Sequence, residues 1–214
     1  MSAPTRRDFG RARIRSHIEA WILSHSPDSA PVRSRKQDTI GAMRGTVVEI
    51  GPGPGSNMPY YADGVRVIAV EPNPVMHDPL RRAAEEHGVE VEIQTVHAED
   101  LDVGDGEADG VVGTLVLCGV DDPRLVLEQV RRILKPGGTY FFYEHVRAPE
   151  GSWTRRAQRL MKRPHAWVAN GCRTDQDTAA LLQDAGFADV QIEELDGGIG
   201  MGWTRKAIIG HATR

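Results

Sequence analysis

A short β-branched segment in the first quarter of the chain runs into a cluster of glycines with an acid just before it. The segment is 46–50, the glycine turn GPGPG follows at 51–55, and Glu49 stands two residues ahead of the first glycine. Because glycine has no Cβ, the backbone can turn sharply there and a ligand can lie against it. A dinucleotide site would need a third glycine where this chain has Ser56. The pattern therefore favours a cofactor that carries an amino acid instead of a pyrophosphate. The carboxylate of Glu49 would suit the amino acid part of such a cofactor.

A second acid closes the next β-branched segment. Residues 66–70 lead into Glu71, and 71 − 51 = 20 residues separate this acid from the first glycine. At that spacing an acid at a strand end reaches the hydroxyl groups of a ribose. The structural alternative is an acid that merely faces solvent where a strand ends. The coincidence of glycine turn and acid favours a nucleoside-containing cofactor.

Glu49 and Glu71 can act on one ligand only if the fold brings their two strand ends together. The sequence pattern of the rest of the chain predicts such a fold. Short apolar segments alternate with amphipathic ones, which is typical of a parallel sheet covered by helices on both faces. Right-handed crossovers then give a doubly wound, Rossmann-like α/β fold with a mostly parallel, seven-stranded sheet. The expected strands are 46–50, 66–70, 89–96, 110–117, 138–145, 188–194 and 204–210, and the expected helices between them are 74–87, 122–134 and 175–185.

Two segments stand outside this alternation. Residues 1–44 are expected to form an N-terminal helical flap, with an amphipathic helix over 8–25 and a second helix after Pro31, ahead of a domain over 45–214. Residues 147–174 are expected to be an insertion, part helix and part loop. Its two tryptophans, Trp153 and Trp167, either roof a pocket or pack in the core, and its arginine run is either a solvated helix face or an attractant for an anionic substrate or lipid headgroup.

The composition excludes several classes of protein. A net charge of −4 and a pI of about 6.1 argue against nucleic acid as a partner. No run of about 18 apolar residues is present and the N-terminus lacks the apolar core of a signal peptide, so no integral membrane protein is expected. The two cysteines form no CxxC pair, so we expect no metal site and free thiols in a reducing, cytoplasmic compartment. A monomer and a homodimer both stay open.

Four motifs taken together resemble the class I S-adenosylmethionine-dependent methyltransferases: the ExGxGxG turn, HAEDL at 97–101, DGVVGTLVLCGV at 109–120 and RILKPGGTYFFYEHV at 132–146. The resemblance implies S-adenosyl-L-methionine as the cofactor. It implies contacts of the turn with the methionine part, of Glu71 with the ribose, of 97–99 with the adenine and of the end of the fourth strand with the methyl group. The family usually has an aspartate where this chain has His97. The implied cofactor-binding residues are Glu49, Gly51, Gly53, Gly55, Asn57, Glu71, Pro72, His97, Ala98, Glu99, Leu117 and Cys118.

Further motifs, TLVLC, EHV, NGCRTDQDT and LLQDAGF, are similar to those of the methyltransferase-like thiol S-methyltransferases, and many are shared with quinone and phospholipid methyltransferases. The resemblance implies methyl transfer to a small-molecule thiol. The alternatives are O-, C- or N-methylation of a natural product, a quinol or a phospholipid headgroup, and a cofactor-binding relative without turnover. His145 is the candidate catalytic base, and a histidine that only caps a strand end is the alternative. A small pocket-lining thiol is the expected role of Cys118.

Overall fold

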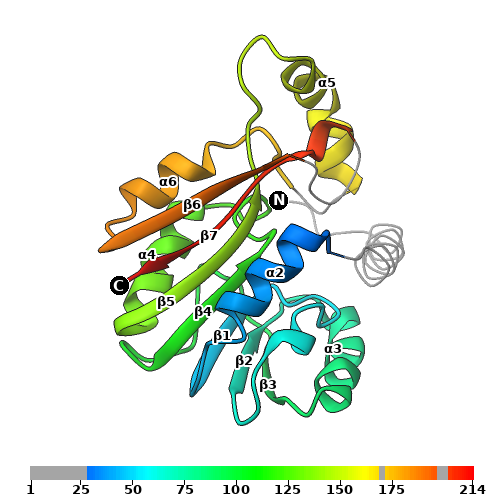
Figure 1. Ribbon diagram of the computed structural model, residues 1–214. Coiled ribbons are helices and arrows are strands. Elements are labelled where there is room, and N and C mark those ends of the chain that lie inside the picture. Colours follow the sequence, from blue (N-terminus) through cyan, green and yellow to red (C-terminus); the bar gives the residue numbers. More distant parts are fainter. Residues whose placement is uncertain (1–27, 169–171, 197–201) are drawn as a thin grey trace, which may run out of the picture.

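The computed structural model describes residues 28–168, 172–196 and 202–214 (Figure 1). They form a seven-stranded sheet in the order β3-β2-β1-β4-β5-β7-β6, in which β7 runs antiparallel to both of its neighbours and the other pairs are parallel. The strands are β1 Thr46–Ile50, β2 Arg66–Val70, β3 Glu90–Gln94, β4 Ala108–Thr114, β5 Leu134–His145, β6 Asp189–Asp196 and β7 Lys206–Thr213. The mostly parallel, seven-stranded Rossmann-like sheet expected from the sequence is confirmed.

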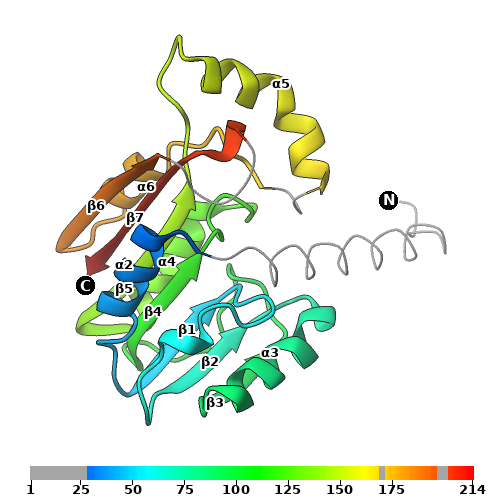
Figure 2. The same cartoon turned by 45° about the vertical axis from the view of Figure 1, so that its right-hand side comes forward.

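Helices cover both faces of this sheet. Helices α4 (Pro123–Ile133) and α6 (Thr178–Asp184) contribute to one apolar core, while α2 (Ala30–Thr39), α3 (Pro74–Glu86) and the 3₁₀ turn η1 (Met58–Tyr60) contribute to the other. Figure 2 shows the two layers on either side of the strands. Central strands are buried from both sides, which explains their nearly continuous apolar sequences.

Two helices begin directly behind the strand ends that matter for a ligand. Asn73 caps α3 by accepting a hydrogen bond from the Val75 N–H, and Asp122 caps α4 by accepting from the N–H groups of Arg124 and Leu125. Both helices have proline at the first position, where the missing N–H costs no intrahelical bond. These local signals fix where the chain turns back along the sheet, and they leave the carboxyl ends of β1, β2 and β4 open.

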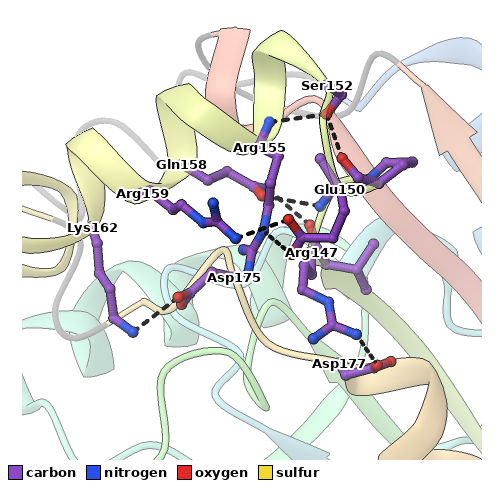
Figure 3. Close-up of polar contacts among 12 residues, drawn as sticks. Arg147, Glu150, Ser152, Arg155, Gln158, Arg159, Lys162, Asp175 and Asp177 are labelled. Atoms are coloured by element: carbon purple, nitrogen blue, oxygen red, sulfur yellow. Dashed lines mark hydrogen bonds and ion pairs between the residues drawn. The ribbon is translucent and has the colours of Figure 1, made fainter.

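Helix α5 (Trp153–Val168) follows β5 and lies beyond its carboxyl end in both ribbon views (Figures 1 and 2). Gln158 connects α5 to the loop directly after β5: its side chain donates to the Val146 carbonyl at 3.0 Å and accepts from the Ala148 N–H at 3.0 Å. Figure 3 shows three basic side chains of α5 paired with acids: Arg155 and Arg159 with Glu150, and Lys162 with Asp175. These pairs anchor the helix, so most of the basic run has partners within the chain.

Most strand and helix bounds differ from expectation by one to three residues, and three differences matter for the site. Strand β4 ends at Thr114 rather than at 117, because Leu115 takes a positive φ of 59° that breaks the extended backbone. Strand β5 begins at Leu134, four residues before the expected start. Trp153 is 79% exposed, so it neither roofs a pocket nor packs in the core.

The N-terminal expectations fall into two parts. The helix expected after Pro31 is α2, which begins one residue earlier, at Ala30; its Val32 and the C-cap residue Ile40 lie in the same apolar core as β1 and β2. The helix expected over 8–25 and the side chain of Trp167 lie outside the described residues, so the division at 44/45 stays a prediction. Among the described helices, none has the length and apolar character to cross a membrane.

Candidate cofactor and acceptor site

The glycine turn lies at the carboxyl end of β1. Gly51, Gly53 and Gly55 have φ values of 61°, 57° and 92°, in the left-handed region that favours glycine. A Cβ on Gly55 would stand 2.7 Å from the Ala83 Cβ, because the turn packs against α3. The Gly51 N–H donates to the Val70 carbonyl at 2.9 Å and ties the turn to β2. The turn is thus packed against α3 and tied to β2 at the carboxyl ends of the strands.

Glu71 borders this turn from the end of β2. It is 6% exposed, and its carboxylate accepts hydrogen bonds from the Gly53 N–H at 3.0 Å and the Asn73 N–H at 2.8 Å. Burial raises the pKa of Glu71, and the two backbone hydrogen bonds partly oppose this effect. A carboxylate has about four acceptor positions, so it can also accept from ribose hydroxyl groups. Pro72, next along the chain, is exposed.

Glu49 is fully buried, and the protein itself satisfies both of its oxygens. Oε1 accepts from Asn57 Nδ2 at 2.7 Å and Oε2 accepts from the Tyr61 hydroxyl at 2.7 Å. Burial raises the pKa of Glu49, while these two hydrogen bonds lower it. Since its amide nitrogen faces a carboxylate, the Asn57 oxygen must point the other way. That oxygen is buried and has no hydrogen-bond partner among the described residues, so a donor from a bound ligand would satisfy it.

The segment expected at the adenine follows β3. His97 is exposed, Ala98 is buried, and Glu99 is half-buried. Glu99 Oε1 accepts from the N–H of Asp121 at 3.1 Å and of Asp122 at 3.4 Å, just before α4. The Glu99 carboxylate therefore positions the loop between β4 and α4.

The loop after β4 presents different residues to the turn from those expected. Leu117 and Cys118 are fully buried, whereas Leu115 and Val116 are half-buried, and Val116 Cγ2 lies 3.1 Å from where a Gly51 Cβ would stand. Leu115 is the one described non-glycine residue with a positive φ. Sequence reasoning missed Leu115 and Val116 because an apolar run gives no sign of where its extended backbone stops.

Glu144, near the end of β5, holds that loop. Its buried carboxylate accepts from the N–H groups of Val116 at 2.9 Å, Leu117 at 2.8 Å and Cys118 at 3.2 Å. Burial raises the pKa of Glu144 to about 7, against the lowering effect of these three hydrogen bonds. Glu144 is thus a positioning residue for the loop.

The next residue, His145, meets both cysteines of the chain. Cys172 Sγ lies 3.3 Å from Cys118 Sγ and 3.6 Å from His145 Nδ1. The hydrogen bond between the two thiols lowers the pKa of Cys172, and His145 and His165 lower it further against the opposing effect of burial. Fifty-four residues separate the cysteines, so their spacing gave no signal of this contact. Of the other polar groups of the insertion, Asn170 lies outside the described residues.

Comparison with known proteins supplies a family. A model described as a methyltransferase domain matches residues 48–142. Thiol S-methyltransferase TMT1B of Homo sapiens is 36% identical over 173 residues, which are 76% of this chain and 71% of that protein. Phosphatidylethanolamine N-methyltransferase of Cereibacter sphaeroides is 29% identical over 131 residues, 60% of this chain and 62% of that protein. A solved SAM-dependent methyltransferase of Thermotoga maritima, described as a possible histamine N-methyltransferase, shares the fold with a TM-score of 0.62 and 24% identity over 94% of this chain and 96% of that one.

Proposed function

This chain belongs to the class I S-adenosylmethionine-dependent methyltransferases, and from that premise we propose that it transfers the methyl group to the sulfur atom of a small-molecule thiol. The observation that carries the thiol is the 36% identity to a thiol S-methyltransferase across 76% of the chain. Methyl transfer to a thiol requires few catalytic groups from the protein. The sulfonium methyl is already electrophilic, so holding an ionised sulfur in line with it supplies most of the catalysis.

The proposed cofactor contacts follow from the atoms that the site leaves open. The unpartnered Asn57 oxygen suits the ammonium group of the methionine part, with Glu49 acting through Asn57 instead of touching the cofactor. The Gly51–Gly55 backbone lies against the same part, and Glu71 accepts from the ribose. Ala98 offers its backbone to the adenine beside the exposed His97 ring. Leu115 and Val116 flank the methyl group, and Leu117 and Cys118 lie behind them.

A second candidate acceptor comes from the other relative. The likeness to a phosphatidylethanolamine N-methyltransferase favours an amine in a phospholipid headgroup. O- or C-methylation of a quinol or natural product would need a base at the acceptor, and His145 at the end of β5 is the proposed candidate. A relative that binds the cofactor without turnover is the remaining class.

An acceptor panel separates these possibilities. The full chain is incubated with cofactor labelled in the methyl group and with matched thiols, phenols, quinols and phosphatidylethanolamine vesicles. Label in a thioether, with none in the oxygen analogue of the same thiol, supports the proposal. Label in the vesicles or the quinol alone rejects the thiol, and S-adenosylhomocysteine binding without any labelled product points to the class without turnover.

The remaining parts of the proposal concern location and assembly. A cytoplasmic location is consistent with the two cysteines being free thiols, the state that reducing compartments maintain. Nucleic acid is excluded from the proposed partners because the net charge is −4. Size-exclusion chromatography with light scattering distinguishes a monomer from a homodimer.

A further inference from the structure

Three soft or borderline metal-binding groups converge behind the loop that meets the glycine turn. Cys118 Sγ, Cys172 Sγ and a ring nitrogen of His145 all lie within 4.8 Å of one another. Cys118 is 0% exposed and His145 is 6% exposed, so water does not solvate these groups as it would on a surface. Two thiolates and an imidazole are the ligands that Zn²⁺ prefers in proteins.

The separations fit a tetrahedral centre. With Zn–S bonds of about 2.3 Å and Zn–N bonds of about 2.0–2.1 Å, two ligand atoms should stand roughly 3.5–3.8 Å apart. The Cys172 Sγ to His145 Nδ1 distance is 3.6 Å, and the Sγ–Sγ distance is 3.3 Å. A widening of the sulfur pair by a few tenths of an ångström therefore brings both of these separations into the tetrahedral range, and the third pair, Cys118 with His145, lies within 4.8 Å.

Each ligand is held by its own element. The Cys118 N–H donates to Glu144, and the Cys118 carbonyl accepts from the Arg173 N–H at 2.6 Å, directly beside Cys172. Gln176 Nε2 donates to the Leu117 carbonyl at 3.2 Å. These contacts fasten the loop that carries Cys172 to the loop that carries Cys118. His145 is fixed by its place in β5, where it pairs with Ala207 of β7. The protein's own contacts thus hold the three groups together without an ion.

A second histidine, His165, lies beside Cys172 and leaves the fourth corner free. His165 Nδ1 accepts a hydrogen bond from Trp203 Nε1 at 3.4 Å, so in the neutral ring the proton is on Nε2. Nε2 is buried and has no hydrogen-bond partner among the described residues. A protonated nitrogen cannot ligate a cation, but it can donate to a sulfur that arrives at the centre. His165 therefore supplies a buried donor near Cys172 instead of a fourth ligand, which is compatible with an open fourth position.

We propose that Cys118, Cys172 and His145 form a three-ligand Zn²⁺ site whose open fourth position binds the sulfur of the thiol substrate. The role of the ion rests on the proposed thiol methylation. Cys118 stands two residues beyond Val116, so the loop that abuts the glycine turn carries both a ligand of the centre and a residue of the proposed methyl position. Catalytic zinc sites characteristically have three protein ligands and one open position.

The step balances without any further co-reactant. The thiol R–SH gives its proton to a base in the solvent as its sulfur binds Zn²⁺, because a coordinated thiol is deprotonated. A lone pair of that sulfur attacks the methyl carbon of the cofactor. The new S–CH₃ bond forms as the bond from methyl to sulfonium breaks, and that electron pair stays on the sulfur of S-adenosylhomocysteine. The neutral thioether is a poorer ligand than a thiolate and leaves.

Metal content tests the site without any turnover. The full chain, purified with a reductant and without chelators, should hold about one zinc per chain by elemental analysis. Cys172→Ala should weaken zinc binding at least tenfold in a competition with a chromogenic chelator, and His145→Ala should do the same. His211→Ala is the matched control, because His211 lines a different hollow with Asp38 and Arg44. Unchanged S-adenosylhomocysteine binding shows that a variant has folded. A reduced chain that binds no zinc, or equal binding by Cys172→Ala, overturns the proposal.

Cobalt substitution tests the open position. Co²⁺ should give a thiolate charge-transfer band and the visible bands of a tetrahedral centre, and a small thiol should shift them while its alcohol analogue does not. A spectrum indifferent to thiols overturns the substrate role. Thiol methylation at full rate by the zinc-free chain rejects this inference and leaves the proposed function standing. A centre that binds zinc and thiol while the acceptor panel shows no thioether retains the metal site and rejects the proposed function.

Discussion

The Asn57 side-chain amide donates to Glu49 Oε1 at 2.7 Å, and this contact orients the amide so that its oxygen faces away from the acid. Each oxygen of the acid that precedes the glycine turn accepts a hydrogen bond within the protein, from Asn57 and from Tyr61. We therefore expect Glu49 to act on the cofactor through Asn57. The Asn57 oxygen is what remains buried and unsatisfied among the described residues.

We expect Asn57→Ala to weaken S-adenosylhomocysteine binding at least about tenfold. The substitution removes one charge-assisted hydrogen bond to the ammonium group, which contributes about 1.5–3 kcal/mol. Calorimetric titration measures the affinity. Gln191→Ala, on the edge strand β6, is the control and should bind normally. An unchanged affinity in Asn57→Ala would mean that the oxygen meets no part of the cofactor.

Glu71→Ala should also lower S-adenosylhomocysteine affinity at least about tenfold. The variant loses charge-assisted hydrogen bonds to the ribose, each of about 1.5–3 kcal/mol, and it frees the Gly53 N–H that the carboxylate now fixes. Glu85→Ala, at an exposed position of α3, removes an equal charge without a contact to the turn. Equal affinities for the two variants would remove Glu71 from the cofactor site.

Gly55→Ala should destabilise the fold by more than about 1 kcal/mol, from a strained φ and from the contact with Ala83. The new Cβ would stand 2.7 Å from the Ala83 Cβ at a φ of 92°. Chemical denaturation measures the free energy of unfolding. The double variant Gly55→Ala, Ala83→Gly should be more stable than the sum of its two single changes implies, because the clash disappears. Gly88→Ala is the control for φ alone, with a φ of 66° and no atom within 4 Å of the new Cβ. Strict additivity of the two changes would contradict the packing argument.

The pH dependence of stability should change in Glu49→Gln. Burial raises the pKa of Glu49 in the folded state, so the folded chain holds this proton more tightly than the unfolded chain. The stability that comes from this tighter proton binding is fully present below the ordinary carboxyl pKa. It is lost as the pH rises through the raised pKa of folded Glu49. The free energy of unfolding should therefore fall less with rising pH in Glu49→Gln than in the parent chain. Denaturation curves across this range provide the measurement, with Glu85→Gln as the control. Parallel pH profiles of the free energy of unfolding for the parent chain and Glu49→Gln would show that the pKa of Glu49 is the same in the folded and unfolded chains.

The sequence by itself determined the order of elements and the glycine turn at which we expect the cofactor to bind. Both depend on neighbours in the chain: the glycines at 51–55 adopt positive φ because no other residue does so cheaply, and proline with a capping residue starts α3 and α4. Alternating apolar segments then permit few arrangements other than a parallel sheet with helices on both faces.

Tertiary structure decided which side chains after β4 remain partly exposed beside the glycine turn. Strand β4 ends because Leu115 has a positive φ, which its residue type does not predict. As a result, Leu115 and Val116 are half-buried, whereas Leu117 and Cys118, the residues expected near the methyl group, are buried. The meeting of Cys118, Cys172 and His145 depends on two loops and a strand that only the packed sheet brings together. Sequence spacing reports contacts within an element or one turn beyond it, whereas these groups come from segments up to 54 residues apart, whose approach is fixed by burial of the whole core.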